Sequence, residues 1–157
     1  MQGKATIARH PIHPILIPFP IVLFVLALVS DVVARFDTTA PLAKLGTLFV
    51  GAGLATGILA AIAGILDFRT AQLDHAARRA GRKHLIVAIA LLVIFNVDLA
   101  LRMRSPDNNA ILPITIVGTV VLAIVGFIGG HLVFVHQVGV SERDEVRATR
   151  PLGASET

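Results

Sequence analysis

Histidines are the side chains of this sequence best suited to chemistry, and most of them lie at one end of long apolar runs. The last run closes with residues 129–136 (GGHLVFVH), which places His131 inside sequence of membrane thickness. A titratable residue at such a position marks a functional site by default. Imidazole binds transition metals, and two imidazoles on facing helices bind haem iron.

The apolar runs themselves predict a membrane protein. The chain has 157 residues, of which 55% are hydrophobic and 15% charged, and its mean hydropathy is +0.79. A soluble domain of this size cannot bury that much apolar surface. Four runs, at about 15–35, 45–66, 84–102 and 111–135, are long enough to cross a bilayer. We predict an all-α integral membrane four-helix bundle over residues 1–140, followed by a disordered cytoplasmic tail over 141–157.

The distribution of Lys and Arg predicts the orientation of the bundle. Ten of the 14 basic residues fall in the N-terminal tail, the loop between the second and third spans, and the C-terminal tail. The other four, Arg35, Lys44, Arg102 and Arg104, fall in the remaining two loops. Because cytoplasmic loops are enriched in Lys and Arg, we expect both termini and the middle loop to be cytoplasmic.

Composition also excludes several classes of function. The chain has no cysteine, which rules out a disulfide, a thiolate-bound cluster and a cysteine nucleophile. No basic, aromatic-interleaved patch stands clear of the membrane, so we expect no nucleic-acid partner. No nucleophile and base can be paired, and the chain is therefore not expected to act as a stand-alone enzyme.

The segment before the first span contains four prolines in residues 11–20. Proline breaks regular helix and restrains the residue before it to extended conformations. His10 and His13 both precede a proline. We therefore predict an extended arm that packs against the inner end of the bundle, with the helix beginning near Pro18 or Pro20.

Depth along the spans places several titratable residues in one inner layer. Arg102 to His84, and Pro113 to His131, are each about 18 residues, or roughly 27 Å of helix. Asp67 ends the second span on the same side, and His13 precedes the first. All four spans thus contribute to this layer, with His10 and His136 close by.

Two ligand sets are open for this layer. A b-type haem would use His84 and His131 as axial ligands, with propionates near Arg9 and Arg78. A transition metal would instead use a group of three or four ligands. That group is His13, Asp67, His84 and His131. Alternatively, His84 and His136 are simply parts of the basic interface.

Two other patterns predict structure. Asp31 and Arg35, like Asp98 and Arg102, are spaced i,i+4 on one helix face. We interpret both pairs as anchors at the outer interface, with the arginines reaching outward. In the second span, small residues recur at four-residue spacing from Gly53, which predicts close helix packing.

Four segments together resemble a known family. They are residues 10–14 (HPIHP), 64–67 (GILD), 78–84 (RRAGRKH) and 129–140 (GGHLVFVHQVGV). They resemble the bacterial membrane-protein family catalogued as domain of unknown function 2231. Its pattern positions match His10, His13, Asp67, His84 and His131 in this chain. Many relatives have an asparagine shortly after the third-span histidine, where this chain has Val87 and Ala88.

The resemblance implies a place near electron transfer in the bacterial cytoplasmic (inner) membrane, because some relatives are joined to Rieske-type or cytochrome-type domains. The family name brings no biochemical activity. We predict a membrane subunit that binds a haem or a metal through inner-face histidines, with the lipid bilayer and other membrane or redox proteins as partners. A homo-oligomer is compatible with this reading. The alternative is a cofactor-free accessory subunit. A transporter ranks last because the middles of three spans are apolar.

Overall fold

The computed structural model describes residues 6–7, 10–36, 42–71, 73–136 and 138, and these are mostly helical. Its elements are β1 (Thr6–Ile7), β2 (His10–Pro11), α1 (Ile12–Leu16), α2 (Pro18–Ala34), α3 (Leu42–Thr70), α4 (His75–Arg104) and α5 (Ile111–Phe134). Four helices in this part of the chain are long and apolar enough to cross a membrane. The predicted all-α membrane bundle is therefore confirmed. The predicted tail at 141–157, and Arg9, lie outside the described residues.

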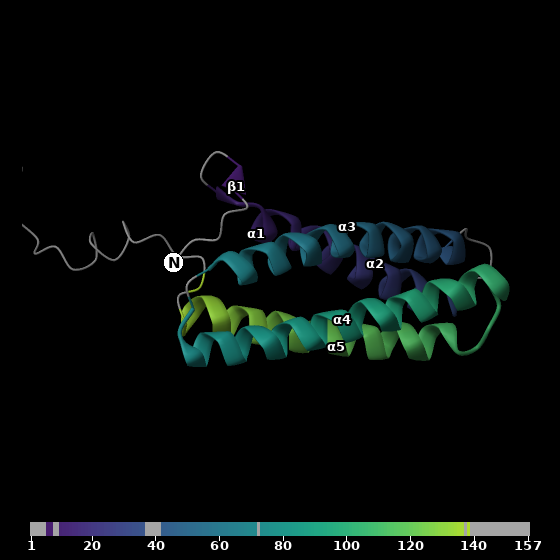
Figure 1. Ribbon diagram of the computed structural model, residues 1–157. Coiled ribbons are helices and arrows are strands. Elements are labelled where there is room, and N and C mark those ends of the chain that lie inside the picture. The colour runs from purple at the N-terminus through teal and green to yellow at the C-terminus, as the bar shows by residue number, and fades with distance from the viewer. Residues whose placement is uncertain (1–5, 8–9, 37–41, 72, 137, 139–157) are drawn as a thin grey trace, which may run out of the picture.

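The long helices run alongside one another, with α2 packed most extensively on α3 and α4 on α5 (Figure 1). Figure 1 shows β1, α1, the α3–α4 connection and the last turn of α5 at one end of the bundle. We call this the histidine end, because His13, His84 and His131 lie toward it. The opposite end, where α2 leads into α3 and α4 into α5, is called the arginine end after Arg102.

The proline-rich segment is helical over Ile12–Leu16, where we predicted an extended arm. Only His10–Pro11 is extended, as β2 pairs antiparallel with β1. The helix forms because Pro14 lies in the first turn of α1, where a backbone N–H has no partner within the helix. His13 is therefore helical although a proline follows it. The predicted helix start at Pro18 is confirmed, and the segment does pack against the bundle, on α3.

Helices α3 and α4 are longer than the predicted spans. α3 continues to Thr70, and α4 begins at His75 rather than near 84. The Asp74 carboxylate caps α4 by accepting a hydrogen bond from the Ala77 backbone N–H at 2.6 Å. With 30 residues, α4 is about 45 Å long, which exceeds the roughly 30 Å of a bilayer hydrocarbon core. Part of α4 must therefore extend beyond the hydrocarbon.

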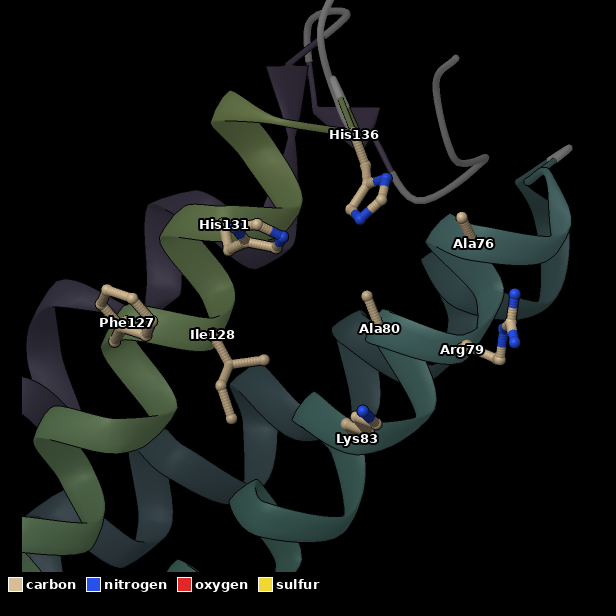
Figure 2. A pocket seen from close by; sticks show the side chains of 8 residues that line it. All are labelled: Ala76, Arg79, Ala80, Lys83, Phe127, Ile128, His131 and His136. Atoms are coloured by element: carbon tan, nitrogen blue, oxygen red, sulfur yellow. The ribbon is translucent and has the colours of Figure 1, made fainter.

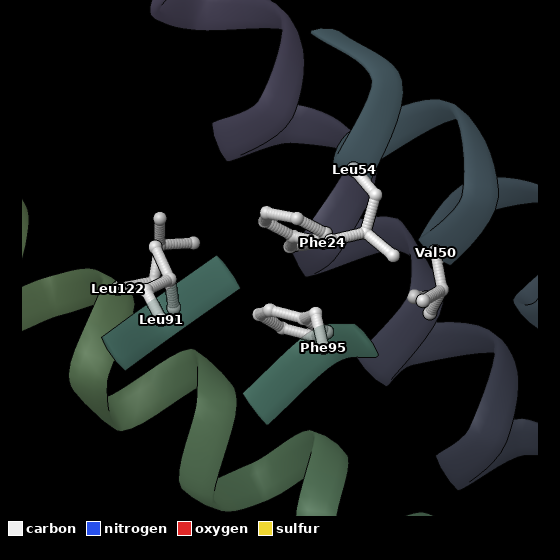
Figure 3. Packing of buried hydrophobic residues seen from close by; sticks show 7 residues of the cluster. Phe24, Val50, Leu54, Leu91, Phe95 and Leu122 are labelled. Carbon is white, nitrogen blue, oxygen red and sulfur yellow. The ribbon is translucent and has the colours of Figure 1, made fainter. Parts of the chain in front are cut away.

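A stacked pair of phenylalanines forms the centre of the bundle. Phe24 of α2 and Phe95 of α4 are fully buried, with ring centroids 3.7 Å apart and an interplanar angle of 2° (Figure 3). A methyl group at Gly53 would lie 2.6 Å from the Phe24 ring, and one at Gly118 would lie 2.8 Å from the Phe95 ring. Glycines in α3 and α5 thus let the two rings fit between the helices, as the small-residue spacing of the second span predicts for α3.

Candidate functional site

His13 points from α1 into the bundle and rests on α3. Its Nδ1 lies 2.7 Å from the Ala60 carbonyl oxygen. Because a carbonyl only accepts hydrogen bonds, Nδ1 donates, and in the neutral ring Nε2 then holds the lone pair. A methyl group at Gly64 would lie 2.9 Å from His13 Cε1, so the ring occupies the space above this glycine. The result is an imidazole with a fixed orientation and an available Nε2.

His84 enters the same end of the bundle from α4 and packs against α5. A methyl group at Gly129 would lie 3.1 Å from His84 Cε1. The ring also interacts with the backbone of Val125, and its charge is close enough to that of His13 for the two to interact. Its Nδ1 is buried and has no hydrogen-bond partner. Since buried polar atoms are nearly always paired, this nitrogen is a candidate ligand atom.

Three other predicted site residues, Asp67, His10 and Arg78, lie in α3, β2 and α4. Asp67 lies at the end of α3, one turn after Gly64, and its Oδ1 is buried without a hydrogen-bond partner. His10 is in β2, at the start of the segment that leads into α1. Arg78, the predicted propionate partner, is exposed near the start of α4. Asp67 Oδ1, like His84 Nδ1, is therefore a buried polar atom without a hydrogen-bond partner.

His131 lies in a different environment, a groove between α4 and α5. The groove has a volume of about 480 Å³, and Figure 2 shows His131 and His136 at its α5 side, facing Ala80 and Lys83 across the opening. The two imidazoles contact each other edge to face, with centroids 5.4 Å apart. Arg79 also lines this groove. His13 and His84 are not among the lining residues.

The structure thus divides the predicted histidine layer into two parts. His13 packs on α3 and His84 on α5 inside the bundle, whereas His131 and His136 line the groove. Over the described ranges, no three His, Asp or Glu side chains form a group that could hold a metal ion. The four predicted ligands are therefore brought together only in part, and cofactor binding stays a prediction.

The groove contains residues that the sequence analysis did not select. Ala76, Arg79, Ala80 and Lys83 are spaced three and four apart, which places them on one face of α4. This spacing was readable from the sequence. The sequence does not show, however, that this face of α4 lines a groove with α5.

The arginine end holds a buried ionic network. Arg102 of α4 donates to Asp31 of α2 through Nη1 at 2.8 Å and Nη2 at 2.5 Å, and to Asp98 through Nε at 3.0 Å. Thr115 of α5 joins both carboxylates and the guanidinium through its hydroxyl. Helix α3 leaves room for the network, because a methyl group at Gly46 would lie 2.8 Å from Asp31 Oδ1. All four long helices therefore meet around one arginine.

This network corrects our interpretation of the two Asp-x-x-x-Arg patterns. Arg102 does not reach outward, since its residue is only 3% exposed. Asp31 pairs with Arg102 across the bundle, whereas Arg35 is exposed. The expected i,i+4 pair of Asp98 with Arg102 is present. The Arg102 guanidinium is buried rather than directed outward because two carboxylates and a hydroxyl together satisfy its hydrogen bonds, which a single partner cannot do.

An apolar layer separates the two polar ends. Phe24, Phe95 and Leu54 are buried between them, together with Val50, Leu91 and Leu122 (Figure 3). The arrangement places two polar sites at opposite ends of the bundle.

The four long apolar helices, with polar residues buried toward both ends of the bundle, define a multi-pass α-helical membrane protein. The chain belongs to the family of predicted membrane proteins DUF2231, and the match covers residues 9–142. This confirms the family resemblance of the sequence motifs. No curated protein and no solved structure matches the chain.

Proposed function

We propose that this protein is a membrane subunit that binds a redox-active cofactor, either a transition metal or a b-type haem, through the histidines of the histidine end. The observation that supports the proposal is the His84 imidazole, whose buried Nδ1 has no hydrogen-bond partner and which lies toward the same end of the bundle as His13. A histidine that binds a metal commonly holds its second nitrogen against a backbone carbonyl. The interaction of the His84 ring with the Val125 backbone fits this pattern.

Binding a metal ion would require less rearrangement of the bundle than binding a haem. The His13 and His84 rings already fill the space above Gly64 and Gly129. A haem between these rings would require the helices to separate, whereas a metal needs only the ring lone pairs and a nearby anionic oxygen. Asp67, with its unpartnered Oδ1, is the candidate for that oxygen. Imidazole and carboxylate together suit iron, copper or zinc, of which the first two are redox-active.

The cellular setting of the proposal follows from the sequence. The excess of Lys and Arg in the tails and in the α3–α4 connection favours a cytoplasmic histidine end. The protein would then accept or donate electrons on the inner face of the bacterial cytoplasmic membrane. Its partners would be other membrane or redox proteins, and its own chain would supply ligands and orientation.

Counting bound metal in purified variants tests the proposal. The protein is stripped of metal and titrated with Co²⁺, whose visible absorption reports imidazole and carboxylate ligation. We expect one Co²⁺ per chain in the parent and its loss in His84→Ala and His13→Ala. His75→Ala, which removes an exposed histidine at the start of α4, is the matched control. Equal binding by all three variants would refute the ligand assignment. A parallel titration with haem examines the second cofactor.

A cofactor-free accessory subunit is the second candidate. It is favoured by the lack, over the described ranges, of any group of three metal-binding side chains. In that case the buried Arg102 network and the Phe24–Phe95 stack would hold a rigid scaffold for a larger complex. Failure of the parent protein to bind either metal or haem in these titrations would select this candidate.

A further inference from the structure

The groove between α4 and α5 has a cationic wall and an apolar wall. On the α4 side, Arg79 and Lys83 are exposed. On the α5 side, Phe127 and Ile128 line the groove, and Phe127 is 78% exposed. Figure 2 shows Ile128 and His131 of α5 across an open space from Ala80 of α4. Within the part of the chain that the structure describes, the lining of the groove contains no acidic residue. Its occupant should therefore have one anionic and one apolar part.

The position of the groove along α4 places it among lipid headgroups. A helix needs about 20 residues to cross the hydrocarbon core. Counted back from the end of α4 at Arg104, about 20 residues reach the neighbourhood of His84, so Arg79 lies beyond the hydrocarbon. The small side chains of Ala76 and Ala80, one turn apart on the same face, keep the groove open. A phosphate group can thus approach both cations.

We propose that this groove binds an anionic phospholipid, with its phosphate at Arg79 and Lys83 and an acyl chain along Phe127. Arginine and lysine both bind phosphate oxygens, and arginine does so through two parallel N–H donors. The apolar wall explains why a lipid fits better than a soluble anion, because Phe127 and Ile128 offer nothing to an inorganic ion. The site is independent of His13 and His84, and it does not depend on the proposed cofactor.

Lipid binding by the full-length protein tests this inference. Native mass spectrometry counts the lipids retained by detergent-purified protein after addition of phosphatidylglycerol or of phosphatidylcholine with the same acyl chains. We expect selective retention of phosphatidylglycerol. The double variant Arg79→Gln/Lys83→Gln should weaken it roughly 30-fold, since each cation near a membrane surface contributes on the order of 1 kcal/mol. The matched control is Arg69→Gln/Arg82→Gln, which removes two exposed cations outside the groove.

A second variant separates the groove from its charges. Ala80→Phe fills the space and leaves every cation in place, so it should also abolish the selectivity. The inference is overturned if the control double variant weakens binding as much as the groove variant, or if Ala80→Phe retains full selectivity. It is overturned as well if inorganic phosphate displaces the lipid, which would indicate a soluble anion. A visible chromophore lost in His131→Ala would assign the groove to a cofactor instead.

Discussion

Replacing Arg102 with methionine should destabilise the bundle more than any other single change at the arginine end. The Arg102 side chain is 2% exposed and hydrogen bonds to both Asp31 and Asp98. Methionine fills similar volume but leaves two carboxylates that are 7% and 0% exposed, with only the Thr115 hydroxyl to donate to them. Breaking a buried ion pair by removing one partner costs about 3–5 kcal/mol. We expect a loss of this size in the free energy of unfolding.

Removing one carboxylate should cost less. In Asp98→Asn the guanidinium keeps Asp31, so one cation and one anion remain paired. The hydrogen bonds that Asp98 accepts are weakened but not all lost, and we expect a cost of about 1–3 kcal/mol. Adding Asp31→Asn and Asp98→Asn to Arg102→Met should recover much of the loss, because no unpaired charge would remain buried.

The assay is a titration with sodium dodecyl sulfate in mixed micelles, followed by far-ultraviolet circular dichroism, which needs no tryptophan. Arg104→Met is the matched control, because Arg104 lies two residues further along α4 and is exposed. The predicted order of midpoints is parent and Arg104→Met highest, Asp98→Asn lower, and Arg102→Met lowest. Identical midpoints for the two arginine variants would refute the idea that the network stabilises the bundle.

Three further predictions concern packing and the histidine end. Gly53→Ala should lower the free energy of unfolding by about 1–3 kcal/mol, because the new methyl group would lie 2.6 Å from Phe24. The control Gly51→Ala, whose methyl group would have nothing within 4 Å, should leave the free energy of unfolding unchanged or raise it slightly. Equal effects of the two substitutions would contradict the packing account. Phe95→Ala should cost about 3–5 kcal/mol by removing a fully buried ring, measured by the same detergent titration, and a change below about 1 kcal/mol would be inconsistent with a central stack. Gly129→Ala should push the His84 ring away from α5, since the methyl group would lie 3.1 Å from Cε1, and so lower Co²⁺ affinity without changing insertion; unaltered affinity would argue against His84 as the ligand.

The membrane fold was predictable because it depends on the length and composition of continuous segments. Four long apolar runs with few charges predict four spans whichever way the helices rotate. Which face of each helix points into the bundle was harder to predict. The bundle interior and the lipid are both apolar, so the pattern of hydrophobic residues does not say which side of α4 faces inward. Arg102 shows the consequence, because only the partner on α2 reveals that it is buried.

The sequence predicts how deep along the bundle the histidines of the candidate site lie, but not which way their side chains point. Counting residues correctly placed His13, His84 and His131 toward one end. It did not show that His131 points into a separate groove with His136, because that depends on helix rotation. The helical conformation of α1 also differs from the predicted extended arm, because Pro14 falls in the first turn, where proline is tolerated.

The measurement that tests the central claim most directly is the cofactor content of the purified full-length protein. Metal is counted per chain, and visible spectra are recorded after oxidation and after reduction with dithionite. Amino-acid side chains do not absorb visible light, so any visible band belongs to a cofactor. We predict either one redox-active metal per chain or a haem band that sharpens on reduction, lost in both cases in His84→Ala. A colourless, metal-free protein from cells supplied with haem and transition metals would contradict the account.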